Sequence, residues 1–307
     1  MALTINTNLS SMIVQSNLSK ATTSLNQAIE RMTTGYKINH ASDNAAGYSI
    51  AKNWEAKLGS LDVAADNAAT GADMLSTLED HYALISQHVQ RVRDLTEQAA
   101  NGTYGSQSLS AINSEITARL QEIDRIAANC EFNGIDLMAG GTTSKQATAG
   151  LDIQVGTEGT ASKSRIHLDA DLFASGAVKD LFEAGGMDSA SVAEVAKKCT
   201  GYDPSANDKK GGMVSDNPAD MLNTIDNVIN AISNRITTLG AAQNRIESAI
   251  ESIGVQSENI TSSLSTLRDA DVATESSNYI KAQILQQASA TLLATANQAP
   301  SIALNLL

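Results

Sequence analysis

Histidine and cysteine are the side chains from which a metal site or a nucleophilic centre is most readily built, and the chain has four of the first and two of the second. His81 and His88 share a predicted helix, but seven residues separate them by about 10 Å along its axis, too far for one ion to bridge adjacent turns. The sequence has neither His-Glu-x-x-His nor Gly-x-Ser-x-Gly, and residues 156–164, the nearest approach to a phosphate loop, lack the glycine before Lys163. We therefore expect no catalytic, metal or cofactor site, and a protein that is not an enzyme.

The two cysteines, Cys130 and Cys199, are too few for a disulfide framework or a structural zinc site. A single bridge between them and two free thiols both remain open at this point.

The charge of the chain excludes two classes of partner. The formal net charge is −13 and no basic cluster occurs, so neither nucleic acid nor an anionic membrane surface is an expected ligand. No run approaches the roughly 18 apolar residues of a membrane span. The N-terminal residues lack a basic start and a continuous apolar stretch, so we expect any export to use a route other than a cleavable signal peptide.

The elements that organise the chain are long helices. Aromatic residues make up only 3% of the sequence, and its three prolines lie at positions 204, 218 and 300. Residues 1–203 and 219–299 are therefore free of the strongest helix breaker. We expect helices that pack through small and aliphatic side chains.

The clearest helical pattern runs from residue 225 to residue 267. Steps of four and three residues give a stripe that is apolar except at two positions: Ile225, Ile229, Ile232, Ile236, Leu239, Gln243, Ile246, Ile250, Ile253, Ser257, Ile260, Leu264 and Leu267. A period of 3.5 is typical of coiled-coil packing. The helix would be about 65 Å long, against a radius of gyration of about 19 Å for a compact globule of this length, which favours a rod.

Two further stripes predict its partners. One runs through Leu75, Leu78, Tyr82, Ile85, Val89 and Val92, and the other through Ile112, Ile116, Leu120, Ile123 and Ala127. Turn-forming residues 101–106 separate them. These helices and the long C-terminal one can bury their stripes together as an antiparallel bundle.

Both ends of the chain also have helical periodicity, through Leu18, Ala21, Leu25, Ala28 and Met32 and through Ile280, Ile284, Ala288 and Leu292. Between Leu267 and Ile280 the stripe changes phase at the charged residues 268–271, so we expect a break between two packing units there. Short isolated helices are marginal in water, so the two ends are expected to become ordered by packing together and against other copies.

The middle of the chain, residues 139–216, has a different composition, rich in Gly, Ser, Thr, Lys and Asp. Apolar and polar residues alternate over residues 151–155 and again over 165–168, which predicts a β-hairpin. Residues 190–198 could form one short helix. We expect a small domain with strand content, carried on the helices.

Several motifs, in the same order along the chain, resemble those of bacterial flagellins. They lie at residues 32–51 (MTTGYKINHASDNAAGYSIA), 89–95 (VQRVRDL), 116–126 (ITARLQEIDRI), 132–134 (FNG), 269–275 (DADVATE), 281–288 (KAQILQQA) and 296–300 (ANQAP). The resemblance covers roughly residues 1–138 and 217–307. It implies a mainly α fold: a long antiparallel helical bundle or coiled-coil rod formed by both chain ends, with a small β-containing domain inserted in the middle.

The resemblance also implies a role and an arrangement. The chain would be a structural subunit that self-assembles into the flagellar filament for motility, and would be extracellular after export by the flagellar type III system. Its partners would be other copies of itself, the export chaperone, the cap and the hook–filament junction proteins. Residues 1–44 and 268–307 would be filament-core helices, 45–138 and 217–267 the two halves of the bundle, and 139–216 a variable outer domain.

Two sets of residues carry the expected contacts. The coiled-coil seam is represented by Leu18, Leu25, Ile229, Ile236, Ile250, Leu264 and Ile284. The resemblance further implies that the monomer is recognised by the host receptor Toll-like receptor 5 through Arg91, Leu95 and Glu115. Arg91 and Leu95 are four residues apart and so would be neighbours on a helix surface. The alternative is that these three residues serve subunit packing alone.

Three other roles remain in view. A hook–filament junction protein would share much of the fold, but residues 281–287 match the flagellin pattern better. A protease carried in the outer domain would need a metal-ligand motif that residues 139–216 lack. A binding or adhesive role for this middle segment is compatible with a filament role.

Overall fold

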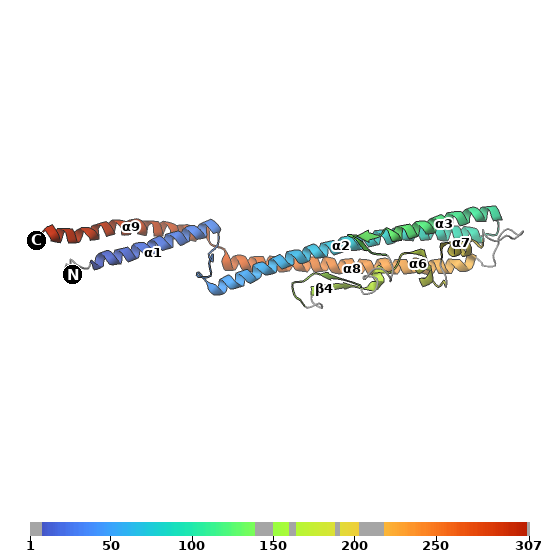
Figure 1. The fold of residues 1–307 in the computed structure, drawn as a ribbon, viewed down its shortest axis with the longest axis horizontal. Coiled ribbons are helices and arrows are strands. Elements are labelled where there is room, and N and C mark those ends of the chain that lie inside the picture. Colours follow the sequence, from blue (N-terminus) through green and yellow to red (C-terminus); the bar gives the residue numbers. More distant parts are fainter. Residues whose placement is uncertain (1–7, 139–149, 160–163, 188–190, 203–217, 306–307) are drawn as a thin grey trace. The chain divides into compact units, whose positions relative to one another are not determined.

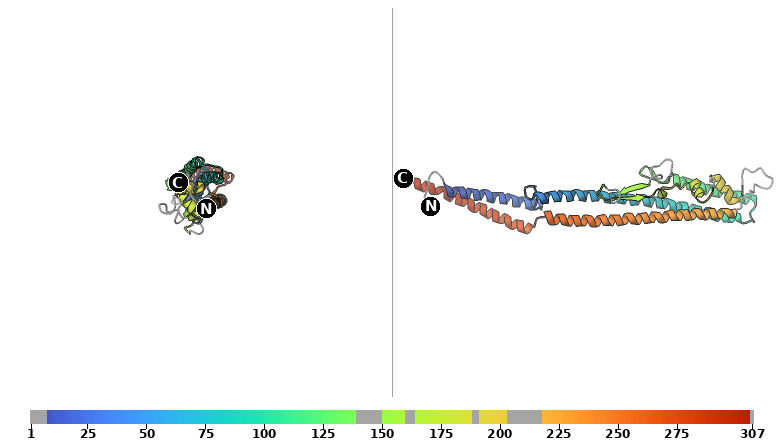
Figure 2. Two further views of the ribbon diagram at one scale, coloured as in Figure 1. Left: turned by 90° about the vertical axis from the view of Figure 1, so that its right-hand side faces the viewer. Right: turned by 90° about the horizontal axis from the view of Figure 1, so that it is seen from below.

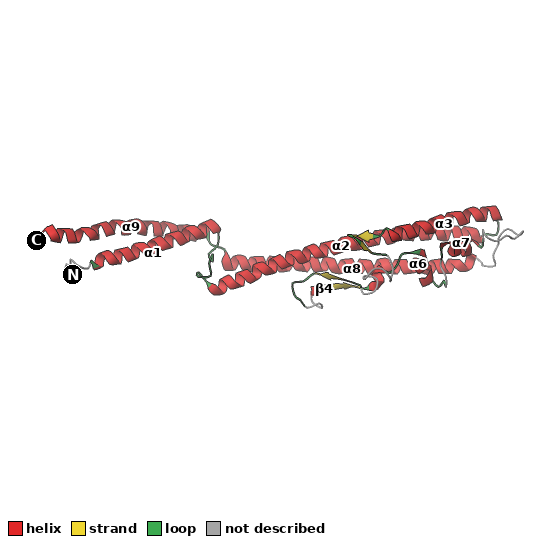
Figure 3. Cartoon of the chain, viewed as in Figure 1, coloured by secondary structure: helices red, strands yellow, loops and turns green. Residues whose placement is uncertain are grey.

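The structure is a computed structural model that describes residues 8–138, 150–159, 164–187, 191–202 and 218–305. Helices account for most of these residues, and the strands lie in the middle of the sequence (Figure 3). The elements in chain order are α1 (Leu9–Thr34), α2 (Ala45–Ala100), α3 (Ser106–Ala128), β1 (Glu131–Phe132), β2 (Ile135–Asp136), β3 (Leu151–Gln154), β4 (Arg165–Leu168), the 3-10 helix η1 (Ala170–Phe173), α6 (Val178–Ala184), α7 (Val192–Thr200), α8 (Pro218–Arg268) and α9 (Val272–Asn305). The expectation of a mainly α fold with a strand-containing middle is confirmed.

The chain divides into two compact units. Unit 1 takes the described residues of 1–59 and 256–307, and unit 2 those of 60–255. Unit 1 therefore combines the two ends of the chain, whereas unit 2 is one continuous stretch of the sequence. The long helix α8 ends at Arg268 and α9 begins at Val272, within the stretch where the change of phase predicted a break.

The core of unit 2 is formed by the apolar stripes of α2, α3 and α8. Every residue of the predicted stripe on α2 is buried, as is every residue of the stripe on α3. The buried positions on α8 include a series spaced seven residues apart, at Ile225, Ile232, Leu239, Ile246 and Ile253, and Val228 is buried between the first two. Gln243 of α8 donates a 2.9 Å hydrogen bond to Glu79 of α2, and Arg93 of α2 lies 2.6 Å from Asp226 of α8, so the two helices run antiparallel.

The middle segment packs directly on this bundle. Strands β3 and β4 pair antiparallel with Leu151 opposite Leu168 and Gln154 opposite Arg165, which confirms the predicted hairpin. Ile153 of β3 lies against Gly71 of α2, where any side chain on residue 71 would clash with it. The described residues of the segment therefore share a core with the helices. Residues 139–149, 160–163, 188–190 and 203–216 of the predicted outer domain lie outside the described residues.

A buried tyrosine and an arginine tether the segment that follows β4. The Tyr82 hydroxyl of α2 donates a 2.9 Å hydrogen bond to the Ala174 carbonyl. Arg235 of α8 donates to the Ser175 carbonyl at 3.0 Å and lies 5.7 Å from the centroid of the Tyr82 ring. Burial raises the pKa of Tyr82, so the hydroxyl keeps its proton and its role as a donor.

Four elements were not predicted from the sequence: β1, β2, η1 and α6. Strands β1 and β2 form a short hairpin around Asn133 and Gly134, whose φ angles of 49° and 76° are those of a type I′ turn. Helix α6 begins where the Asp124 carboxylate of α3 accepts a 2.8 Å hydrogen bond from the Val178 amide. The predicted short helix at 190–198 is present as α7.

Both cysteines are buried, free thiols. Cys130 interacts electrostatically with Tyr82, and Cys199 hydrogen-bonds with Thr96. Fourteen residues of helix α2 separate Tyr82 from Thr96 by about 21 Å, whereas the Cα atoms of a disulfide lie within about 7 Å. No disulfide therefore joins the two cysteines in this structure.

In unit 1 the two breaks between helices pair with each other. The Lys37 amide donates to the Arg268 carbonyl at 2.7 Å, and the Ala270 amide donates to the Gly35 carbonyl at 2.8 Å. Residues 36 and 269 thus form an antiparallel bridge. The φ angle of 74° at Gly35, which ends α1, favours glycine because other residues are strained in this region.

Arg268, the last residue of α8, closes this junction. Its guanidinium lies 4.1 Å from the centroid of the Tyr36 ring. It also donates a 3.3 Å hydrogen bond to the Ile38 carbonyl and forms an ion pair with Glu55 of α2. One side chain therefore contacts the loop after α1 and the first part of α2.

Two aspartates stabilise the backbone turns at the junction. Asp43 accepts hydrogen bonds from the His40 and Asn39 amides, each at 3.1 Å, and the bond to His40 contributes most to lowering the pKa of Asp43. Asp271 caps α9: it accepts hydrogen bonds from the Thr274 hydroxyl at 2.8 Å and from the Ala273 amide at 2.9 Å, and these lower its pKa.

We predict that neither thiol reacts in the folded protein. Burial raises the pKa of Cys130 and of Cys199 from 9.0 to about 12, so about one part in ten thousand is thiolate at pH 8. A disulfide reagent such as Ellman's reagent should release almost no colour from the native chain and two equivalents in urea. Rapid stoichiometric labelling of the native chain would contradict this burial.

We also predict that acid weakens unit 1. The pKa of Asp43 is lowered from 3.8, so its ionised form stabilises the fold above about pH 4, and this contribution is lost as the pH falls through the lowered value. Asp43→Asn should lower the urea midpoint at pH 7, and the difference from the unmodified chain should disappear as the pH falls through the lowered pKa of Asp43, below 3.8. The single tryptophan, Trp54 in unit 1, gives the fluorescence signal. Ser42→Ala, at the neighbouring exposed position, is the control, and any change it makes in the urea midpoint should be the same at every pH. If the effect of Asp43→Asn on the midpoint were also independent of pH, ionised Asp43 would not be the stabilising group.

Candidate self-assembly surface

Helices α1 and α9, called the terminal helix pair below, pack antiparallel in unit 1 and lie side by side in both views (Figures 1 and 2). Apart from Glu275 of α9, the residues buried on the two helices are small: Ala21 and Ala28 on α1 and Ala282 and Ser289 on α9. Small side chains let two helices approach closely, since the interaxial distance depends on the residues at the contact. The contact between α1 and α9 therefore buries little of the surface of their large apolar side chains.

Hydrogen bonds join the two helices along their length. The Asn8 side chain, which caps α1, donates to the Ala296 carbonyl at 2.8 Å. The Gln286 amide donates to the Thr22 hydroxyl at 3.2 Å. These bonds set the register of the terminal helix pair, because each joins residues more than 260 positions apart in the sequence.

An ion pair fixes the end of the pair next to the junction. Arg31 of α1 lies 3.2 Å from Glu275 of α9, and the Glu275 side chain is only 10% exposed. Glu275 also accepts a 3.4 Å hydrogen bond from Asn278. The Arg31 Nε atom is buried and has no hydrogen-bond partner among the residues that the structure describes.

The large apolar side chains of the terminal helix pair face outwards. Twelve of the fifteen exposed large apolar side chains in the described residues belong to unit 1. Ten of them lie on the pair: Leu9, Met12, Ile13, Ile29, Met32, Val272, Ile280, Ile284, Leu285 and Leu292. Exposed apolar surface gathered on one element indicates a site of protein–protein contact.

The terminal helix pair is also nearly free of charge. Its two helices contain three cationic residues (Lys20, Arg31 and Lys281) and two anionic ones (Glu30 and Glu275), a net charge of +1. The whole chain has a net charge of −13. Identical copies can therefore bring these helices together without the repulsion that the rest of the chain would produce.

The predicted seam residues fall into two groups. Leu18, Leu25, Ile229, Ile236, Ile250 and Leu264 are half-buried in the single chain. Ile284 is 59% exposed and Ile280, from the same predicted stripe, is 52% exposed. Within the single chain Ile280 and Ile284 are thus exposed, and Ala282 and Ser289 are the residues of α9 buried in their place. Ala288 and Leu292, from the same stripe, line the hollow between α1 and α9.

The three candidate receptor-contact residues do not share one environment. Arg91 and Glu115 are joined by hydrogen bonds of 3.0 and 3.1 Å on the surface of α2 and α3. Leu95 is only 2% exposed and belongs to the core. This differs from the expectation that Leu95 is a surface neighbour of Arg91, because burial follows the apolar stripe of α2 and not the four-residue spacing.

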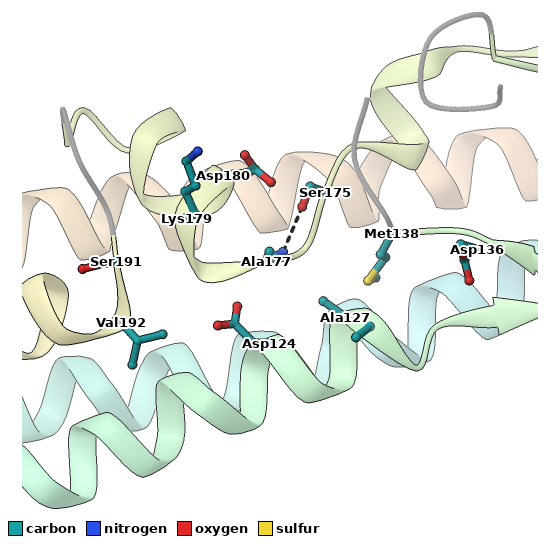
Figure 4. Close-up of a pocket in the computed structure, with 11 residues that line it drawn as sticks. Asp124, Ala127, Asp136, Met138, Ser175, Ala177, Lys179, Asp180, Ser191 and Val192 are labelled. Carbon is teal, nitrogen blue, oxygen red and sulfur yellow. Dashed lines mark hydrogen bonds between the residues drawn. The ribbon is translucent and has the colours of Figure 1, made fainter. Parts of the chain in front are cut away.

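A cavity of about 530 Å³ in unit 2 lies between α3, α6 and α7 (Figure 4). Its polar groups support the backbone: Asp124 caps α6, and the Ser175 hydroxyl accepts a 3.1 Å hydrogen bond from the Ala177 amide. Across the described residues, no group of three His, Cys, Asp or Glu side chains is placed to hold a metal ion. Nor does any helix there have the length and apolar character to cross a membrane.

The sequence did not single out Arg268, Tyr36 or Arg235, which the structure places at the junction and at the tether. A partial signal existed for Arg268 and Tyr36, since each lies beside a break in helical periodicity. Arg235 gave no signal, because its partners are the Ser175 carbonyl and Tyr82, which lie far from it in the sequence.

Comparison with known proteins identifies both ends of the chain. Residues 5–143 match the family model of the bacterial flagellin N-terminal helical region, and residues 222–307 match that of the C-terminal helical region. The chain is 35% identical to the flagellin of Xenorhabdus nematophila over 325 residues, covering 100% of both proteins. It is 32% identical to the flagellin of Bacillus subtilis (strain 168) over 315 residues, covering 99% of both.

A solved structure supports the fold. The structure of a putative flagellar hook-associated protein from Vibrio parahaemolyticus superposes with a TM-score of 0.58 at 16% identity, over 74% of this chain and 100% of that one. At this identity the likeness concerns the fold alone. The two family models and the full-length relatives go further: the chain belongs to the bacterial flagellins, a family of structural proteins, not enzymes, that assemble into the filament of the flagellum.

Proposed function

We propose that the terminal helix pair makes the contacts between copies in the core of the filament. The observation that carries this proposal is the set of ten exposed large apolar side chains on a pair of helices with a net charge of only +1. Unit 2 buries the apolar stripes of its own helices, so it has less need of a partner. On this proposal residues 1–44 and 268–307 are the filament-core segments.

The rest of the chain would be arranged outside these segments. Residues 45–138 and 217–267 would form the two halves of the bundle around the core, and residues 139–216 would form the outer domain. The half-buried seam residues Ile229, Ile236, Ile250 and Leu264 support this, because they have apolar surface left over for a neighbouring copy.

We infer further that the chain reaches the outside of the cell through the flagellar type III export system. Before assembly the apolar row of α9 would be exposed to non-specific association. This supports the binding of an export chaperone to the C-terminal segment until the subunit joins the filament. At the filament ends, the cap and the hook–filament junction proteins would meet the same helices. The full-length match to flagellins favours a filament subunit over a junction protein.

We also propose that the free monomer is recognised by Toll-like receptor 5 through the surface around Arg91 and Glu115. Both side chains are exposed, at 48% and 38%, and Arg119 lies 3.8 Å from the same Glu115 carboxylate. Leu95 would contribute by packing beneath Arg91 and holding α2 against α3, since its own side chain is buried.

The first prediction concerns assembly. Removal of residues 1–32 or of residues 272–307 should abolish polymerisation, because each deletion removes one helix of the terminal pair. Sedimentation and negative-stain microscopy after addition of salt and seeds would measure this, with the full-length chain as the reference. Circular dichroism should show that unit 2 stays folded. Filaments formed by either truncated chain would contradict the proposal.

The second prediction concerns the receptor. Arg91→Ala should weaken receptor activation by the monomer about tenfold, the effect of losing an interface arginine worth roughly 1.4 kcal/mol. The dose–response of a reporter cell line would measure it. Arg245→Ala, at an exposed position of α8, is the matched control and should leave the response unchanged. An unaltered response to Arg91→Ala would remove Arg91 from the contact.

A further inference from the structure

We propose that Ile280 and Ile284 of one copy insert into the groove between α1 and α9 of the next copy. This inference rests on the proposed role of the terminal helix pair in assembly. It goes further by naming the two different surfaces that meet, so the two ideas can fail separately.

The groove is a hollow of about 680 Å³ along the terminal helix pair, enclosed by α1 and α9 alone. Ala21, Ala28 and Ala282 form part of its lining, and their short side chains leave the space open. Leu285 and Leu292 add apolar lining from α9. The groove therefore offers a stretch of apolar lining, flanked by polar side chains, with room for aliphatic side chains from outside the chain.

The two isoleucines form a knob on a separate face. They are four residues apart, which makes them neighbours on the helix surface. Each is also two residues from Ala282, the buried residue that faces α1, and so lies about 200° around α9 from it. Because the knob points away from α1, it cannot enter the groove of its own chain and is available to another copy.

One buried polar atom of the groove favours an occupant that offers an oxygen atom. Arg31 is paired with Glu275, and Lys20 and Lys281 also line the groove, so an occupant that brings a further cation is disfavoured. The buried Arg31 Nε atom lacks an acceptor among the described residues. Gln287 lies three residues after Ile284, on the exposed side of α9, and its amide oxygen can supply an acceptor without adding charge.

The difference between knob and groove determines the kind of assembly. A contact between two different surfaces leaves each copy with one unused knob or groove, so further copies can add at either end. A contact that used the same face on both copies would close as a dimer. The geometry of the terminal helix pair therefore fits open-ended growth, which is what a filament requires.

Cross-linking of assembled protein tests the inference. Two full-length variants would be mixed, polymerised and oxidised: Ile284→Cys, in the knob, and Ser24→Cys, in the groove. The native cysteines are buried, so they should not take part in the cross-link. We expect a disulfide-linked dimer in the mixed polymer and little in either variant alone. Ser19→Cys, exposed on α1 outside the groove, is the matched control for Ser24→Cys and should not cross-link. Cross-linking of Ile284→Cys chains to each other, or none in the mixed polymer, would overturn the inference.

A second measurement covers the case in which a cysteine variant does not polymerise. Ala288→Trp fills the groove and should raise the lowest protein concentration that polymerises about tenfold, whereas Ala290→Trp, exposed outside the groove, should leave it nearly unchanged. If Ala288→Trp and Ala290→Trp changed this concentration equally, the knob-and-groove contact would be overturned. The proposed role of the terminal helix pair in assembly would still stand, provided that removal of residues 272–307 abolished polymerisation.

Discussion

The close approach of the two chain ends is the constraint on which the rest of unit 1 depends. Ala21 and Ala28 meet Ala282 and Ser289, and these short side chains bring the helices together while burying little apolar surface. The larger aliphatic residues of both helices are therefore left outside. A pair of helices with this distribution holds its shape through register-setting hydrogen bonds and one ion pair, and it keeps most of its apolar surface for other molecules.

The junction connects this pair to the start of α2 and the end of α8 within unit 1. Arg268 contributes a ring contact, a hydrogen bond to a carbonyl and an ion pair, each with a different segment or residue. Asp43 and Asp271 satisfy backbone amides that the breaks in the helices would leave without partners. Polar interactions therefore define how the helices end at this junction.

Helical periodicity was sufficient to predict the stripes of α2, α3 and α8, because buried positions in these helices recur at intervals of three and four residues. For α9 the periodic stripe through Ile280 and Ile284 does not coincide with the residues buried within the chain, Ala282 and Ser289. A single sequence does not show which stripe faces which partner. The alternation at residues 151–155 predicted β3, whereas the Asn133–Gly134 turn signal was overlooked because its strands have only two residues each. The surface exposure inferred for Leu95 failed because spacing alone does not determine burial.

The tether of the middle segment has an evolutionary consequence. Tyr82 and Arg235 hold this segment by the carbonyl oxygens of residues 174 and 175, groups that every amino acid carries. Substitutions at these two positions need not weaken the attachment, provided that the main chain keeps its path. The bundle can therefore present diverging sequences from one unchanged anchor, and selection on the anchor falls on α2 and α8 more than on the segment they hold.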